Sequence, residues 1–519
     1  MHRFHTARRV MAAALLGGLL GAAPALHAAP PPEAATCVGC HGADGLGNAA
    51  AGYPRLAALP APYLAAQLRH YGKGTRNNPI MSAMAKPLTA AQITAVAAYY
   101  AGLPAGTPPE APTPAPDAQA LAVGERLALR GDWNAGIPAC TRCHGPGAAG
   151  VGADFPALVG QPAAYLEAQI KAWKDGSRRG DPQGLMRTVA LRLSDAQTQA
   201  VAQWLATQPL APGAAASATV DAPPPVGAAS GAAAPAASGT RARLNAAAGT
   251  GARFTPPPES AIPDDDFGKM VRLGRNIVLE TPTYAKAFVG NTLSCANCHL
   301  DAGRMAGSAP LWAAYVSYPA YRAKNHKVNT FAERLQGCFT FSQNGSAPPP
   351  GSETLVALEA YAFWLSKGLP VDEKVAGRGY PELPKPARAP DYARGQAVYA
   401  AKCALCHGAD GQGQLTHGAT VFPPLWGPQS FNWGAGMASY KNAAAFIRAN
   451  MPYGMSYSLS PQEAWDVAYF MNAHERPQDP RWLGSVAATR AKFHNTPFSL
   501  YGTVVKGTLL GDTGAPPAR

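Results

Sequence analysis

Eight of the nine cysteines lie in four copies of one short motif, in which two residues separate a pair of cysteines and a histidine follows directly. The copies are Cys37-Val38-Gly39-Cys40-His41, Cys140-Thr141-Arg142-Cys143-His144, Cys295-Ala296-Asn297-Cys298-His299 and Cys403-Ala404-Leu405-Cys406-His407. At this spacing both thiols can form thioethers with the vinyl groups of one haem, while the histidine binds its iron. A single copy could equally be half of a zinc site or a redox dithiol. Four copies predict four covalently attached haem c groups.

A second iron ligand is expected farther along each repeat. In three repeats a methionine stands 40 to 44 residues after the motif histidine, and these are Met81, Met186 and Met451. Met84 and Met455 are the local alternatives, and Met84 is expected to pack in a core instead. Near the end of every repeat, a polar first residue and an apolar stripe predict a helix: Thr89 to Ala101, Ser194 to Ala206, Ser352 to Lys367 and Ser460 to Ala473. The pattern indicates small helical units of the cytochrome c type.

The third repeat lacks a methionine at this distance. No methionine occurs between Met305 and Met437, and Cys338 stands 39 residues after His299 instead. We therefore predict that the Cys338 thiolate is the second ligand of this iron. His326 is the alternative ligand, and a free thiol or an intermolecular disulfide is the non-ligating interpretation. Because a thiolate is also a nucleophile toward sulfur, which an electron carrier does not need, the third unit is the predicted catalytic unit.

Basic residues accumulate between the third motif and Cys338. They are Arg304, Arg322, Lys324, Lys327 and Arg334, against the acidic Asp301 and Glu333. Ser342, Gln343 and Asn344 follow Cys338 with neutral hydrogen-bond donors. Arginine presents forked donors that suit oxyanions, although a solvated face or a clamp for haem propionates would explain any single member. Beside a thiolate ligand, the set predicts a small anionic substrate that contains sulfur.

The first 29 residues have the pattern of a secretory signal peptide. Arg3, Arg8 and Arg9 precede the apolar run Val10 to Leu20, and small residues lead to Ala29. We expect cleavage near Ala29 and a periplasmic protein without a membrane span, because the run is shorter than the ~20 residues that cross a bilayer. The formal net charge of +13 loses three charges with this peptide, and haem propionates offset more. Nucleic-acid binding is therefore not expected.

Composition divides the rest of the chain. The stretch 210–263 is rich in alanine and proline and predicts a flexible linker that cannot bury a core. The expected fold is mainly α, with four class I cytochrome c-type domains arranged as two dihaem halves on either side of this linker. The expected domains are 30–108, 117–209, 264–380 and 390–482, followed by an arm at 483–519. The first two units have the simple design of electron carriers.

Five segments of the second half resemble the dihaem thiosulfate dehydrogenases. They are Val289-Gly290-Asn291, Cys295 to Arg304, Tyr318 to Arg322, Leu335 to Phe339 and Ala435 to Met437. The resemblance covers the chain from about Pro263 to the C-terminus. The first half resembles the dihaem cytochrome c4 type, which accepts electrons from that enzyme in some bacteria. The whole chain is therefore similar to an enzyme fused to its own acceptor.

The resemblance implies that two thiosulfate ions are joined to tetrathionate, with two electrons passing through the second haem to the fused carrier. It also implies that His299 and Cys338 bind the catalytic iron, that His407 and Met451 bind the next, and that the same site can reduce tetrathionate. Substrate-binding roles follow for Arg334 and Ser342, and less directly for Arg322 and Lys324. A small periplasmic cytochrome or a high-potential iron-sulfur protein is the expected onward acceptor.

Other functions use the same residues. A haem protein that transfers thiosulfate to a protein cysteine would also need a thiolate-ligated iron, together with a partner protein. A tetrahaem electron relay would use Cys338 only to set a potential, and a dihaem peroxidase would need a releasable ligand. Some thiosulfate dehydrogenases exchange a lysine for the methionine, but Asn450 stands in that position here, so we do not expect lysine exchange.

Overall fold

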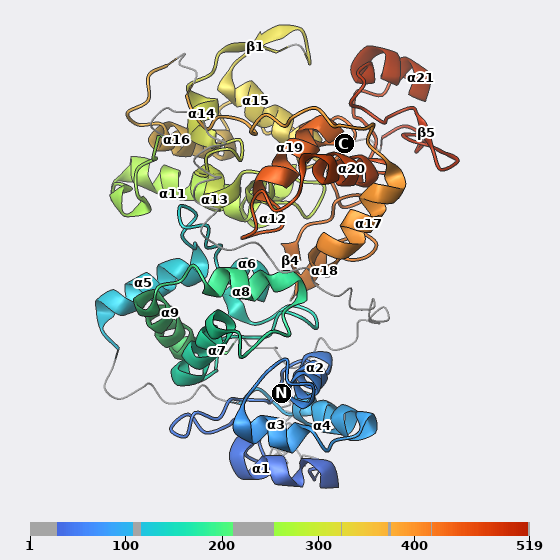
Figure 1. The fold of residues 1–519 in the computed structure, drawn as a ribbon. Helices are drawn as coiled ribbons and strands as arrows, with labels where there is room; N and C mark the ends of the chain where they lie inside the picture. Colours follow the sequence, from blue (N-terminus) through green and yellow to red (C-terminus); the bar gives the residue numbers. More distant parts are fainter. Residues whose placement is uncertain are drawn as a thin grey trace, which may run out of the picture.

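The computed structural model describes residues 29–106, 116–210, 254–322, 324–371, 375–416 and 418–516. Within these residues the chain is mainly helical, as predicted, and strands form only three short antiparallel hairpins. Figure 1 shows unit one at one end of the molecule, unit two in the middle, and units three and four together at the other end. None of the described helices is long and apolar enough to cross a membrane. The predicted signal peptide and most of the predicted linker lie outside the described residues.

The units of the first half contain helices and short turns. Unit one consists of α1 (Ala35–His41), α2 (Ala61–Gly72), α3 (Pro79–Ala85) and α4 (Ala90–Gly102). Unit two consists of α5 (Ala118–Leu129), α6 (Thr141–His144), α7 (Ala163–Asp175), α8 (Leu185–Ala190) and α9 (Asp195–Thr207).

The second half adds the hairpins. Unit three contains α11 (Asp266–Leu279), α12 (Thr281–Tyr284), α13 (Leu300–Gly303), α14 (Leu311–Tyr315), β1 (Ala320–Arg322), β2 (Lys327–Asn329), α15 (Phe331–Gly337) and α16 (Glu353–Leu365). Unit four contains α17 (Tyr392–Lys402), α18 (Ala404–His407), β3 (Gln414–Thr416), β4 (Ala419–Phe422), α19 (Tyr440–Asn450) and α20 (Pro461–Asn472). The C-terminal arm holds α21 (Val486–Thr489), β5 (Val504–Val505) and β6 (Thr508–Leu509).

The four predicted late helices are confirmed as α4, α9, α16 and α20. Thr89, Ser194 and Ser460 each cap one of them, and in each case a Gln or Glu three residues later completes a capping box. Ser352 precedes α16 without a side-chain cap. Because a capping box satisfies backbone donors that the first turn leaves free, these starts are encoded locally.

In units two, three and four the first helix crosses the last at a glycine. A Cβ built on Gly124, Gly274 or Gly395 would lie 2.2, 2.0 or 2.1 Å from a carbonyl oxygen of the crossing helix. A side chain at this position would therefore push the two helices apart. Each crossing belongs to the hydrophobic core of its own unit, with Tyr361 and Trp364 fully buried in unit three. The sequence repeat therefore corresponds to a recurring helix crossing in these three units.

The ends of the second half pack on its units. Residues 254–263, which the sequence placed in the linker, lie against unit three: Phe254 packs on Trp312, and Pro256 and Pro257 accept hydrogen bonds from Arg304. In the arm, Tyr501 and Leu510 are buried in a cluster with residues of unit four. Both segments therefore cover apolar surface.

Replacing Gly274 with alanine should destabilise unit three, because the added methyl group meets the α16 backbone. We expect a loss on the order of 1–3 kcal/mol, typical of overpacking, measured by thermal unfolding followed by circular dichroism. Gly102→Ala in α4 is the matched control, since a Cβ there meets nothing within 4 Å. An unchanged melting temperature in Gly274→Ala would contradict the close crossing.

Candidate functional site

Each motif histidine is fixed in the same way. The Nδ1 atoms of His41, His144, His299 and His407 lie 3.0, 2.7, 2.6 and 2.9 Å from backbone carbonyls of Pro54, Pro156, Ala309 and Pro423. Since a carbonyl only accepts, Nδ1 carries the proton and Nε2 remains free to bind a metal. Three of the histidines end a short helix (α1, α6 and α18), and His299 directly precedes α13.

Burial keeps these imidazoles neutral. It lowers the pKa of His144 and His299 to about 4, and it also lowers the pKa of His41 and His407. A neutral imidazole is the form that binds iron. The Nε2 atom of His144 is buried without a hydrogen-bond partner among the described residues. A buried ring nitrogen aimed away from its carbonyl partner fits an axial iron ligand.

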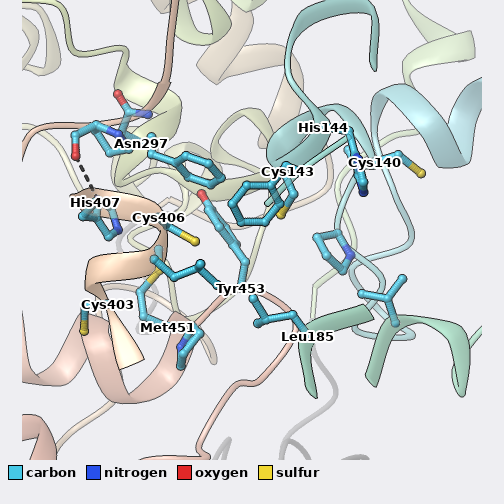
Figure 2. Close-up of a pocket in the computed structure, with 18 of the residues that line it drawn as sticks. Cys140, Cys143, His144, Leu185, Asn297, Cys403, Cys406, His407, Met451 and Tyr453 are labelled. Atoms are coloured by element: carbon cyan, nitrogen blue, oxygen red, sulfur yellow. Dashed lines mark hydrogen bonds between the residues drawn. The ribbon is translucent and has the colours of Figure 1, made fainter. Parts of the chain in front are cut away.

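One continuous cavity of about 510 Å³ joins the motifs of units two, three and four. Its wall includes both cysteines and the histidine of each of these motifs, together with Met186, Met451 and Cys338. Figure 2 shows the part of this wall between His144 and His407, with Tyr453 between Cys143 and Cys406. The donor set of each unit, two thiols and a neutral imidazole, fits covalently attached haem c.

The three proposed methionine ligands lie on or next to different helices of their units. Met186 lies on α8 and Met451 directly follows α19, and both face the cavity. Met81 lies on α3, which Asn78 caps by accepting a hydrogen bond from the Met81 backbone. Met84 on the same helix is 39% exposed, so the expectation that it packs in a core is wrong. The buried residue of this helix is Ala85 instead.

Cys338 begins a π-helical turn, Cys338–Ser342, that continues directly from α15. Arg334, one turn earlier, donates from Nη1 to the Cys338 sulfur at 2.8 Å. The nearby Cys338 sulfur raises the pKa of Arg334, so this guanidinium stays charged. A π-helical turn inside a helix is frequent at functional sites, and here it separates Cys338 and Ser342 along one wall. Arg334, Cys338 and Ser342 all line the cavity with His299.

The remaining basic residues divide into two groups. Arg322 lines the cavity and donates to the hydroxyl of Tyr318 at 2.9 Å. Lys327 instead pairs with Glu333 at 2.8 Å on the outside of the hairpin. The alternative ligand His326 lies in the exposed turn of the same hairpin, with a positive φ. The fold therefore brings part of the basic cluster to the cavity and leaves part in solvent.

Lys324 does not line the cavity, although Arg322 and Arg334, which do, lie near its ammonium. The residue as a whole is exposed, but its ammonium contacts the carbonyl of Gly434 and lies 4.0 Å from the centre of the Phe341 ring. Partial burial of the ammonium and the neighbouring Arg481 lower the pKa of Lys324 to about 7. The charge of this side chain therefore changes near neutral pH.

Sequence reasoning missed two tyrosines of the cavity wall, and it named a third residue, Gln343, only as a neutral donor. Tyr380 lies near Cys298 and Arg334, and burial raises its pKa. Tyr453 lies near the cysteines of three motifs, and burial raises its pKa to about 12. The Gln343 side chain is buried, and its Oε1 has no partner among the described residues. Tyr380 and Tyr453 come from loops of other segments, so no local spacing could have found them.

The fold and the donor sets define a multihaem c-type cytochrome. The family model for cytochrome c matches residues 33–103, 135–209 and 392–475, and the model for the SoxA/TsdA cytochrome c domain matches residues 282–371. Covalently bound haem c is a property of such domains. Unit three thus matches a different family model from the other three units, and the matched segment contains Cys338.

Relatives define the particular family. The chain is 80% identical to the thiosulfate dehydrogenase of Thiomonas intermedia over 279 residues, which are 54% of this chain and 89% of the relative. It is 68% identical to the thiosulfate dehydrogenase electron acceptor of the same organism over 218 residues, 42% of this chain and 99% of that relative. The chain therefore belongs to the thiosulfate dehydrogenase family and is an oxidoreductase that carries an electron-acceptor half.

A solved structure spans both halves. The thiosulfate dehydrogenase TsdBA of Marichromatium purpuratum is 47% identical, with a TM-score of 0.81 over 92% of this chain and 96% of that one. The resemblances stated from the sequence, to the enzyme and to a cytochrome c4-type acceptor, are confirmed.

Proposed function

We propose that this chain oxidises two thiosulfate ions to one tetrathionate in the cavity of unit three and delivers two electrons to its own first half. The observation that carries this proposal is the contact between Arg334 and Cys338 in a cavity that also holds His299. It combines a sulfur nucleophile, a fixed positive charge and an iron ligand in one place.

The proposed haem sites use one histidine and one sulfur ligand each. The pairs are His41 with Met81, His144 with Met186, His299 with Cys338, and His407 with Met451, and the four cysteine pairs form the thioethers. Four bound haem c groups supply one-electron redox chemistry, so a two-electron oxidation can be divided between two of them.

The residues of unit three then do the sulfur chemistry. Thiosulfate is a dianion, and the charges of Arg322 and Arg334 offset the repulsion between two such ions. Ser342 adds a neutral donor on the same wall. In the first step the sulfane sulfur of one thiosulfate bonds to the Cys338 sulfur, and two electrons leave. In the second step another thiosulfate attacks that sulfane sulfur, the bond to Cys338 breaks, and tetrathionate departs.

Contacts between the halves support electron delivery from unit four to unit two. Phe155 and Phe422 pack with ring centres 5.1 Å apart, in an apolar cluster that includes Cys143 and Cys406. The thioether cysteines of the two units thus share one water-poor contact. Electrons that arrive in unit two then reach unit one inside the acceptor half.

The same residues would serve the reverse reaction, because tetrathionate reduction retraces both steps. We further propose a periplasmic location after removal of the leader, and a small cytochrome or high-potential iron-sulfur protein as the onward acceptor.

The holoprotein with Cys338→Gly should keep four haem groups but lose tetrathionate formation, because both steps need the sulfur. Mass spectrometry measures the haem count. Turnover is measured as tetrathionate formed with an artificial one-electron acceptor. If wild type releases no tetrathionate, or if the variant equals wild type, the proposal is wrong.

Arg334→Gln should reduce kcat/KM for thiosulfate by roughly a hundredfold or more, the usual cost of removing a fixed donor from a charged site. Lys327→Gln is the matched control, since it removes one positive charge of the same segment from an exposed pair. If both variants lose the same amount of kcat/KM, the effect comes from long-range electrostatic attraction and not from a specific contact of Arg334.

The KM for thiosulfate should rise with pH. The pKa of Lys324 is lowered to about 7, so its positive charge is present below that value and is lost above it. The charged groups that face this ammonium are Arg322, Arg334, Arg481 and Asp479. We expect a rise of up to about tenfold between roughly pH 6 and 8. Lys324→Arg should flatten the profile, and an unchanged slope in that variant would assign the effect to another group.

A further inference from the structure

The loop that carries Met451 is held by the acceptor half. It joins α19 to α20 in unit four, and Gly454 lies three residues after Met451. Arg192 of unit two donates from Nη1 to the carbonyls of Gly136, in its own unit, and of Gly454. One guanidinium therefore ties a loop of unit two to the Met451 loop.

Apolar contacts accompany this tie. The rings of Tyr453 and Trp133 lie 6.0 Å apart at 57°. A Cβ built on Gly454 would lie 3.6 Å from Pro138 and 3.7 Å from Val189, so both side chains line the loop at van der Waals distance. Trp133, Pro138 and Val189 all belong to unit two. The loop thus rests on unit two through both a charged donor and packed side chains.

Within unit four the loop is held mainly by its own backbone turns. Met451 donates to Ile447 at the end of α19, Met455 donates to Pro452, and Tyr457 donates to Arg448, each at 2.8 Å. The Tyr453 ring also lies near Cys406 of unit four and Cys298 of unit three. The side-chain hydrogen bond from Arg192 reaches the loop from unit two.

The two ligand segments also touch each other. Val189, which packs beside Gly454, lies on α8, the helix that carries Met186. Arg192 follows α8 by two residues. The segment that presents the proposed iron ligand of unit two therefore packs on the loop that presents the proposed ligand of unit four.

We propose that unit two clamps the Met451 loop, with Arg192 as the positioning residue, so that the acceptor half sets the iron ligation and redox potential of unit four. This inference rests on the proposed ligation by Met451. Groups outside the ligand shell orient the ligands and tune the metal. Since coupling between two sites is reciprocal, the state of unit four also influences unit two.

Arg192→Ala in the full-length holoprotein tests the clamp. Methionine ligation raises the potential of a haem iron, so a loosened Met451 should lower one midpoint potential and weaken the methionine-to-iron charge-transfer absorption of the oxidised protein. Arg192→Lys keeps a positive donor and should restore part of both signals. The measurements are a potentiometric titration and optical spectroscopy, with circular dichroism to confirm folding.

Two further variants separate the possible outcomes. Arg130→Ala is the matched control, because it breaks a different contact between the halves, the ion pair with Glu259, and should leave both signals unchanged. Met451→Ala is the reference for loss of the ligand. If Met451→Ala changes neither signal, the proposed ligation fails. If Met451→Ala changes them but Arg192→Ala matches wild type, ligation stands and the clamp is wrong.

Discussion

The burial of a neutral histidine against a backbone carbonyl is the constraint on which the four units depend. A buried imidazole loses its charge, and the carbonyl accepts a hydrogen bond from its one N–H at Nδ1, which leaves Nε2 without a protein partner. An unpartnered nitrogen in an apolar wall is costly unless a metal occupies it. Capping boxes fix the start of the late helix in units one, two and four. Glycine crossings hold the packing in units two, three and four, with Gly274 and Gly395 in the second half.

Unit three differs from this design in the residue proposed as its second ligand and in its charge. The π-helical turn after α15 puts Cys338 on the cavity wall with Arg334 beside it. Arginine keeps its charge when buried, so it can stabilise a thiolate and still attract a dianion. A lysine behaves differently, because partial burial brings the pKa of Lys324 near neutrality. The same basic segment therefore supplies one permanent charge and one that depends on pH.

The halves are in contact as well as covalently connected. Unit two touches unit four through Phe155 and Phe422. Its Arg130 also pairs with Glu259, in the segment 254–263 that packs on unit three. Its central position gives electrons a short path out of the enzyme half. Through Arg192, the acceptor half also contacts the loop that carries Met451. A carrier that docks in this way can adjust the site from which it receives electrons.

The sequence by itself determined the four motifs, the cytochrome c class and the late helices, because thioether attachment and capping boxes use residues close together in the chain. It also led to the prediction that Cys338 is the second ligand in unit three, because the other repeats supplied a register. The tertiary structure alone decided which basic residues reach the cavity. Arg322 lines it, whereas Lys327, its cross-strand partner, pairs with Glu333 in solvent. The tertiary structure alone also revealed Tyr453 and the contact between Arg192 and Gly454. Contacts between residues some 260 positions apart depend on how folded units pack, which no local spacing encodes.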